Sequence, residues 1–199
     1  MRGWMLSGRH DMSWQFAGCL AALLFAAWPA HAADYRIDSA RSHADFGVRL
    51  LWLSQITGRF EEIDGEVTLS SLHDTAVVDA RITVDSIQMS SDRMRRWVLA
   101  PEFFDVSHYP SIHFVSEPIS LAMLEKGGEL DGTLTLRGVT RPARFELQPS
   151  RCPLHEPQEC VISVRGTIQR SDFGMSGHRT AVSDRVDLGM MISLDYAQR

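Results

Sequence analysis

Residues 130–145 read LDGTLTLRGVTRPARF, and this stretch decides the fold expected for the chain. Apolar and polar residues alternate on both sides of Arg137-Gly138, which is typical of two antiparallel strands joined by a two-residue turn. Gly138 supplies the positive φ that such a turn requires. Leu136 then stands opposite Val139. The two strands share one apolar face, formed by Leu134, Leu136, Val139, Ala143 and Phe145.

The same two-residue period runs through most of the chain after residue 33. The segments that show it are 35–38, 46–52, 63–69, 79–87, 111–123, 160–170 and 186–196. Each has one apolar and one polar face, as antiparallel strands do when only one side is buried. About eight strands with exposed edges would be prone to aggregate unless the sheet closed on itself. We therefore expect an all-β, eight-stranded antiparallel barrel, filled by side chains or holding one small ligand.

One segment, residues 90–110, breaks the strand pattern. Ser90 or Ser91 can cap a short helix over residues 92–99. Pro101 then begins a second turn that places Phe103 and Phe104 for burial. We therefore expect one helical crossover between the strands.

The first 32 residues read as a secretory signal peptide. Arg2 and Arg9 precede an apolar run over 16–28, which ends in a small-residue cleavage site at 30–32. The run is too short for a permanent membrane anchor. The expected products are a signal peptide, residues 1–32, and one exported barrel domain, residues 33–199.

Charge and cysteine content agree with export. Removal of Arg2, Arg9 and Asp11 leaves 18 basic and 24 acidic residues, a net charge of about −6 that disfavours binding to nucleic acid. Cys152 and Cys160 remain as an even pair in an oxidising compartment, and we expect a disulfide between them. The alternative is a metal pair with His155 as a third ligand.

No catalytic or cofactor motif stands out. The chain lacks a nucleophile elbow, a phosphate-binding glycine loop, a dinucleotide fingerprint and the paired histidine or cysteine spacings of metal sites. We assign no catalytic residue, no metal and no cofactor. An enzymatic alternative would use His43, His108 or His178 with a nearby aspartate as the general base.

Three arginines in the predicted helix, Arg93, Arg95 and Arg96, form a basic cluster. They are possible contacts to the polar or anionic head of a ligand at the mouth of the barrel. The simpler interpretation is a solvated helix face whose aliphatic stems cover apolar surface.

The whole set of motifs resembles the YceI-like family, exported bacterial proteins with a lipocalin-like barrel. The resemblance runs in order through YRIDSARSHADFGVRLL, ITGRFEEIDGEV, ARITVDSIQM, APEFFDVSHYPSIHFVSEPI, LDGTLTLRGVTRPARFEL, GTIQRSDFGM and VDLGMMISL. It implies that the helical crossover covers one end of the barrel. It also implies binding, carriage or storage of a long isoprenoid lipid or quinone precursor in the periplasm, with no reaction. The implied cavity lining is Phe46, Val48, Phe60, Ile82, Val84, Phe103, Phe114, Leu134, Leu136, Phe145, Phe173, Met190 and Ile192.

Residues 94–99 depart from the family. Many members carry a polar R-D-x-H-L-R pattern there, whereas this chain has MRRWVL. Head-group contacts therefore cannot be transferred to these positions. A small exported enzyme acting on a bound lipid and a stress-induced scaffold remain as alternative functions. A monomer or homodimer with transient membrane contact is compatible with each.

Overall fold

The hairpin quoted above forms as its alternation predicts. It consists of β9 (Gly128–Leu136) and β10 (Val139–Leu147), with Leu136 opposite Val139. Arg137 and Gly138 have φ values of 51° and 69°. Positive φ at both central residues is the mark of a type I′ turn, whose twist matches that of the flanking strands.

The computed structural model describes residues 33–51, 54–70, 72–150 and 160–196, and these are mostly strand. No helix in these ranges is long and apolar enough to cross a membrane. Besides β9 and β10, the strands are β1 (Ala33–Ile37), β2 (His43–Leu50), β3 (Ser54–Phe60), β4 (Ile63–Ser70), β5 (Thr75–Thr83), β6 (Ile87–Met89), β7 (Ser111–Ser116), β8 (Ile119–Ser120), β11 (Val161–Gln169) and β12 (Val182–Tyr196).

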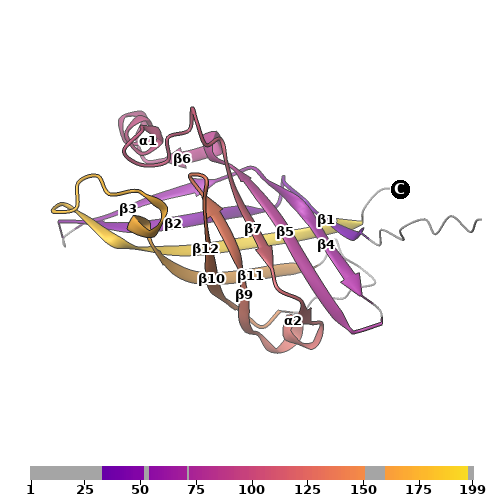
Figure 1. Ribbon diagram of the computed structural model, residues 1–199. Helices are drawn as coiled ribbons and strands as arrows, with labels where there is room; N and C mark the ends of the chain where they lie inside the picture. The colour runs from indigo at the N-terminus through magenta and orange to yellow at the C-terminus, as the bar shows by residue number, and fades with distance from the viewer. Residues whose placement is uncertain (1–32, 52–53, 71, 151–159, 197–199) are drawn as a thin grey trace, which may run out of the picture. The chain divides into compact units, whose positions relative to one another are not determined.

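The strands close into an eight-stranded antiparallel barrel (Figure 1). The ring runs β1-β4-β5-β7-β9-β10-β11-β12 and returns to β1. Three further strands continue strands of the ring beyond bends in the chain: β2 continues β1, β3 continues β4 and β6 continues β5. The pairing shows this, because β12 pairs with both β1 and β2, and the pairing of β2 with β3 continues that of β1 with β4. The predicted fold is confirmed, and each of the eight strands of the ring has a partner on both sides, whereas β6 pairs with β3 alone.

Two predicted strands are interrupted. The strand expected over 79–87 ends at Thr83, because Val84–Ser86 forms the short 3₁₀ helix η1. Ser86 Oγ stabilises this turn by donating to Thr83 O at 2.7 Å and accepting from Glu62 N at 3.1 Å, the local bonding by which serine competes with a strand.

The strand expected over 111–123 ends at Ser116. It gives way to Pro118, the short β8 and then α2 (Ala122–Lys126), which stops at Gly127 with φ 73°. Glycine tolerates this positive φ because it has no Cβ, so the chain can leave the helix at Gly127. The sequence pattern missed α2 because a short apolar run fits both periods.

The predicted helix is α1 (Asp92–Leu99), and Ser91 is its cap. Ser91 Oγ accepts a hydrogen bond from Met94 N at 3.3 Å, which satisfies one of the free amides of the first turn. Val98 turns inward and is buried, whereas Phe103 and Phe104 follow in the loop, buried and half-buried. The α1 end of the barrel lies opposite the α2 end (Figure 1).

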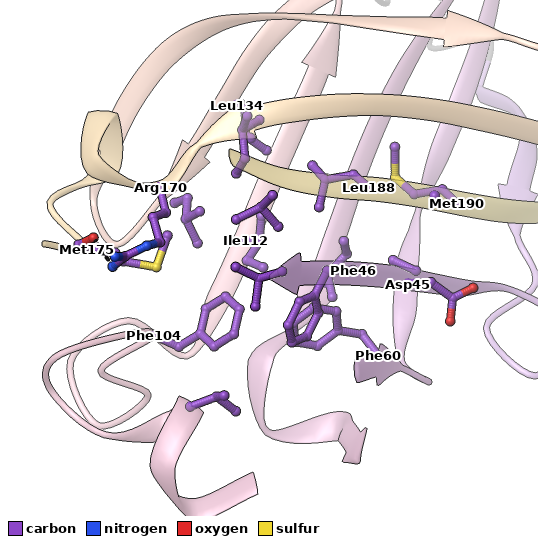
Figure 2. A pocket seen from close by; sticks show the side chains of 18 of the residues that line it. Asp45, Phe46, Phe60, Phe104, Ile112, Leu134, Arg170, Met175, Leu188 and Met190 are labelled. Carbon is purple, nitrogen blue, oxygen red and sulfur yellow. Dashed lines mark hydrogen bonds between the residues drawn. The ribbon is translucent and has the colours of Figure 1, made fainter. Parts of the chain in front are cut away.

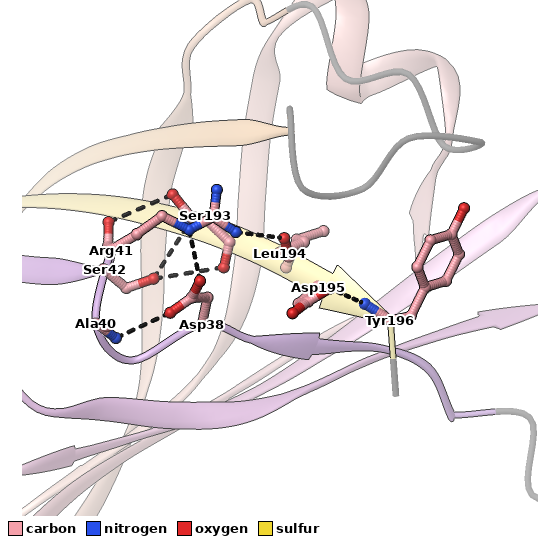
Figure 3. Close-up of polar contacts among 8 residues, drawn as sticks. All are labelled: Asp38, Ala40, Arg41, Ser42, Ser193, Leu194, Asp195 and Tyr196. Carbon is pink, nitrogen blue, oxygen red and sulfur yellow. Dashed lines mark hydrogen bonds and ion pairs between the residues drawn. The ribbon is translucent and has the colours of Figure 1, made fainter. Parts of the chain in front are cut away.

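Polar contacts secure the bend between β1 and β2 (Figure 3). Arg41 donates to the carboxylate of Asp38 and, at 3.2 Å, to Leu194 O on β12. Ser42 Oγ accepts from Ser193 N at 3.0 Å. The bond from Arg41 lowers the pKa of Asp38, although slight burial opposes it. These contacts join the bend to β12 where that strand passes from β2 to β1.

Candidate ligand cavity

The half of the barrel next to α1 encloses an apolar cavity (Figure 2). Its volume is about 110 Å³, counted as the space that the centre of a water molecule can reach. Ala44, Phe46, Ile112, Leu134 and Leu188 contribute from the strands, while Trp97, Phe103 and Phe104 contribute from the crossover. We call the opposite part of the barrel, toward α2, the filled half. Its fully or nearly fully buried side chains include Ile37, Val67, Ala76, Leu130, Leu147, Ile162 and Leu194, none of which reaches the cavity.

Ten of the thirteen predicted lining residues border this cavity. They are Phe46, Val48, Phe60, Ile82, Phe103, Phe114, Leu134, Leu136, Phe145 and Met190. Strand parity brings nine of them to the inner face, whereas Phe103 comes from the crossover. Whether they contact a ligand stays a prediction.

Val84, Phe173 and Ile192 do not border the cavity, so the prediction was wrong about their position. Val84 and Phe173 lie in 3₁₀ helices, η1 and η3 (Arg170–Phe173), where strand parity does not apply. Ile192 has the expected parity on β12 but falls in the filled half. All three are buried core residues.

Two charged residues border the cavity, and the charge of neither points freely into it. Asp45 directs its carboxylate away from the cavity, toward Arg59 on the outer face, with an Nε–Oδ1 distance of 2.7 Å (Figure 2). Arg170 is 2% exposed, and its guanidinium donates to Met175 O, Ser183 O and Val182 O at 2.6, 2.9 and 3.0 Å. Burial lowers the pKa of Arg170 but leaves it charged. The cavity therefore offers an apolar surface.

The sequence prediction did not include several residues that line the cavity, among them Arg170, Ile56 and Ile168. Ile56 has the same parity as Phe60 on β3, and Ile168 alternates on β11, so periodicity could have identified both. Arg170 carries no such signal, because a charged residue is expected at the surface. Its three main-chain acceptors, which make burial tolerable, become apparent only in the folded chain.

Aromatic rings gather at the mouth, which we define as α1, residues 100–110, the turn at 137–138 and residues 174–181. Trp97 meets Phe103 edge to face, with ring centroids 4.5 Å apart. The His178 ring stacks on Phe103 at 6.0 Å with an interplanar angle of 4°. Phe104 packs against Phe46 and Phe60 at 5.8 and 5.5 Å. Of these rings, Trp97, Phe103 and Phe104 border the cavity at this end of the barrel.

Arg137 joins three segments of the mouth. From the hairpin turn its guanidinium donates to Pro101 O and to Gly174 O, each at 3.0 Å. It also lies 3.9 Å from the carboxylate of Asp105 and 5.9 Å from the centre of the Tyr109 ring. Removal of this side chain would break these contacts between the three segments, while the stacking of Phe103 on His178 would remain.

A model of the YceI-like domain matches residues 35–194 of the chain. The chain belongs to the YceI-like family. "Protein YceI" of Salmonella arizonae is 29% identical over 187 residues, which cover 90% of this chain and 95% of the relative. The resemblance inferred from the motifs is thereby confirmed.

Solved structures share the YceI-like barrel. BcnA of Burkholderia cenocepacia superposes with a TM-score of 0.65 at 19% identity, covering 80% of this chain and 99% of that chain. A domain of Saccharophagus degradans, described as a polyisoprenoid-binding domain, gives a TM-score of 0.61 at 15% identity, covering 83% and 99%. The YceI protein of Campylobacter jejuni gives 0.57 at 20% identity, covering 74% and 88%.

The arginines of α1 do not border the cavity of this YceI-like barrel. Arg95 donates to Asp85 O, Asp85 Oδ1 and Ile87 O at 2.6, 2.7 and 3.0 Å, and so fixes α1 to η1 and β6. Arg93 and Arg96 are exposed. The structure gives Arg95 a structural contact and leaves Arg93 and Arg96 on the solvated helix face.

The three histidines considered as general bases lie outside the described cavity lining. His43 Nε2 is 3.6 Å from the Asp45 carboxylate, and His108 Nδ1 is 2.9 Å from that of Asp105. The bond from His108 lowers the pKa of Asp105. His178 stacks on Phe103 instead of meeting a carboxylate. His43 and His108 thus each meet a carboxylate, as the enzymatic alternative expects, but none of the three histidines borders the described cavity.

Only one residue of the cysteine prediction lies in the part of the chain that the structure describes. Cys160 is fully buried directly before β11, whereas Cys152 and His155 lie outside the described residues. The Cys152–Cys160 disulfide and its metal alternative therefore stay predictions, as does the signal peptide over 1–32. In the described ranges no three His, Cys, Asp or Glu side chains converge as a metal site would require.

Proposed function

We propose that this protein binds a long isoprenoid lipid or quinone precursor in the barrel cavity, and carries or stores it in the periplasm. The observation that carries the proposal is the enclosed apolar cavity, whose two charged neighbours, Asp45 and Arg170, are both occupied elsewhere. The polyisoprenoid-binding description of the similar Saccharophagus degradans domain supports the class of ligand.

Burial of apolar surface supplies the driving force. Each Å² of apolar surface removed from water contributes about 25 cal/mol, so an isoprenoid chain gains in proportion to its length. Ordering the flexible chain offsets part of this gain. Soft side chains such as Met175 and Met190, which border the cavity, adapt to the methyl branches of such a ligand.

The cavity volume suits a slender chain. A volume of about 110 Å³, counted as the space that the centre of a water molecule can reach, is several times what one buried water needs, so the cavity has room for part of a slender chain. Because the filled half closes one end, a chain longer than the hollow half must fold back or protrude through the mouth.

The periplasmic part of the proposal rests on the N-terminal sequence. The basic start, the apolar run over 16–28 and the small residues at 30–32 support export. A water-soluble barrel that shields an isoprenoid chain would lower the free-energy cost of moving it through an aqueous compartment.

Lipid extraction tests the proposed function. The protein is purified from its own host without detergent, and the bound material is identified by mass spectrometry. We expect an isoprenoid chain in a stoichiometric amount. The stripped protein should then bind neutral prenols with an affinity that rises from C15 to C40. Empty protein that binds no prenol of any length would contradict the proposal.

A further inference from the structure

One leucine beside the mouth is exposed although its backbone conformation is costly. Leu51 directly follows β2, is 57% exposed and has a φ of 49°, a value that bulky residues rarely adopt. Its N donates to Ala181 O at 2.7 Å, which holds this part of the backbone against the mouth. A single exposed leucine is ordinary on a protein surface. One that the backbone presents to solvent at a conformational cost indicates a functional position.

Two exposed arginines lie beside Leu51. Arg49 and Arg179 border the same surface hollow as Leu51, and neither forms a hydrogen bond or ion pair with another described residue. Asp184 also borders this hollow, but Ser171 donates to both of its carboxylate oxygens, at 2.9 and 2.6 Å. We call Leu51, Arg49 and Arg179 the Leu51 tip. Its composition suits a membrane interface, where an apolar side chain enters the acyl region and guanidinium groups bind lipid phosphates.

Charge is distributed unevenly between the mouth and the α2 end, which lie at opposite ends of the barrel (Figure 1). The mouth together with residues 49–51 carries six arginines and three carboxylates. The α2 end comprises residues 72–74 and 117–129, which Leu121 joins by donating from N to Asp74 O at 2.9 Å. It carries four carboxylates and one lysine. The mouth is thus the positive end of a chain whose formal net charge is −5.

Distance and salt prevent the acidic end from cancelling the attraction of an anionic surface for the mouth. β9 runs from the α2 end to the turn at Arg137, and its nine residues span about 30 Å at about 3.4 Å each. The Debye length is only about 10 Å at roughly 0.1 M salt. An anionic surface that faces the mouth therefore interacts with the arginines and hardly at all with the carboxylates near α2.

The Leu51 tip also adjoins the apolar cavity. Val182 borders both the cavity and the hollow that contains the tip, and Trp97 and Phe103 border the cavity from the mouth. A bilayer in contact with the tip would therefore face the end of the barrel at which the cavity lies.

We propose that the Leu51 tip docks the mouth of the barrel onto an anionic lipid bilayer. Leu51 enters the interface, and Arg49 and Arg179 contact lipid phosphates. Docking in this orientation would let an apolar ligand pass between bilayer and cavity with little exposure to water. The inference goes beyond the proposed function, because it concerns the outer surface of the mouth and holds whichever ligand the cavity takes.

Vesicle flotation with the protein as purified from its host tests the inference. One set of vesicles contains phosphatidylcholine alone, and the other contains a mixture with anionic phosphatidylglycerol. We expect partitioning onto the anionic vesicles to be stronger by about tenfold or more, since each arginine near an anionic surface contributes roughly fivefold. Added salt should weaken this partitioning. Arg49→Gln/Arg179→Gln should lose most of the preference, and Leu51→Ser should weaken binding about fivefold.

The chain offers a matched control for each change. Leu72→Ser replaces a leucine that is 90% exposed, in the turn between β4 and β5 at the acidic end. Arg36→Gln/Lys126→Gln removes the same charge as the double arginine variant, but from exposed residues of β1 and α2. Both controls should bind anionic vesicles as well as the native protein does, and thermal denaturation should show that all four variants fold.

Equal partitioning onto the two kinds of vesicle, or an equal loss in the matched controls, would overturn the inference. Failure to bind any vesicle would overturn it as well and would leave the Leu51 tip to a protein partner. Farnesol titration of the same variants keeps the two proposals apart. Retained affinity for farnesol without vesicle binding would count against docking alone, whereas loss of farnesol binding in the native protein would count against the proposed function.

Discussion

The ring of Phe46 on β2 lies directly over Gly58, its partner on β3. A Cβ added to Gly58 would stand 2.4 Å from Phe46 Cε1, well inside contact distance. The absence of a side chain at Gly58 thus leaves room for a ring that borders the cavity and touches Phe60 and Phe104, with centroids 5.8 Å away in each case. Phe145 covers Gly166 in the same manner across β10 and β11.

Gly58→Ala should therefore force the Phe46 ring toward the cavity. We expect a loss of about 1–3 kcal/mol in the free energy of unfolding, as overpacked cores show, together with weaker ligand binding. Urea denaturation and prenol titration measure the two effects. Gly189→Ala on β12 is the control, because nothing lies within 4 Å of its added Cβ. Equal stability of the two variants would show that the contact between Phe46 and Gly58 does not constrain the ring.

Ala76 and Ala80 have the same parity on β5 but belong to different halves of the barrel. Ala80 borders the cavity, whereas Ala76 is 1% exposed in the filled half. Ala80→Leu should enter empty space, change stability little and weaken the binding of long prenols. Ala76→Leu should overpack its site and cost about 1–3 kcal/mol. Thermal denaturation with prenol titration distinguishes them; a reversed order of stability would mean that the hollow and filled halves are wrongly placed.

Arg137 provides a case in which local and tertiary preferences oppose each other. Asn-Gly is the favoured pair for a type I′ turn, so the turn alone would gain from Arg137→Asn. The variant loses the bonds to Pro101 O and Gly174 O, and we expect a net loss of about 1–3 kcal/mol. Hydrogen exchange should rise in residues 100–105 and 174–178.

Arg141→Asn serves as the control for Arg137→Asn. Arg141 is exposed on β10 and makes one longer bond, 3.4 Å to Asp172 O. Its replacement should leave exchange at the mouth unchanged. Stabilisation by Arg137→Asn would mean that turn preference outweighs the contacts across the mouth.

The free energy of unfolding should decrease at acidic pH, partly because Asp105 becomes protonated. Its hydrogen bond from His108, opposed by partial burial and aided by Ser107 and Arg137, places its folded pKa below the ordinary value. Such a carboxylate contributes stability above the unfolded pKa of about 3.9, and the contribution is lost as the pH falls through the folded pKa. Asp105→Asn should flatten the decline measured by urea denaturation between pH 5 and about 2.5.

The Asp105→Asn variant should keep part of this acid sensitivity, because the pKa values of Asp38 and Asp184 are also lowered. Asp64→Asn is the control, since that exposed carboxylate forms no hydrogen bond or ion pair with the described residues. A decline in Asp105→Asn as steep as that of the native protein would assign the acid sensitivity to other groups.

The alternation of apolar residues was sufficient to predict the barrel, because one buried face per strand determines parity and a long sheet must hide its edges. The turn at Arg137-Gly138 and the cap at Ser91 followed from residues with strong local preferences. What the pattern could not provide was the point at which a strand bends. Val84 was misplaced because Ser86 bonds within a turn, and α2 was missed because five residues cannot show a helical period.

The site was harder to predict than the fold. Parity identifies an inward side chain but not whether the space before it is empty, so Ile192 and Met190 looked alike in sequence, although only Met190 borders the cavity. The mouth depends on contacts between distant segments, such as those of Arg137 with residues 101 and 174. No local sequence pattern indicates a buried arginine, such as Arg170, whose guanidinium is bonded by main-chain carbonyls.

Because the barrel has one hollow half and one filled half, ligand choice and strand packing depend on different residues. Substitutions around the cavity would change which apolar ligand fits, while the packing of the filled half would stay as it is. Evolution or protein engineering could thus exchange one ligand for another without rebuilding the scaffold.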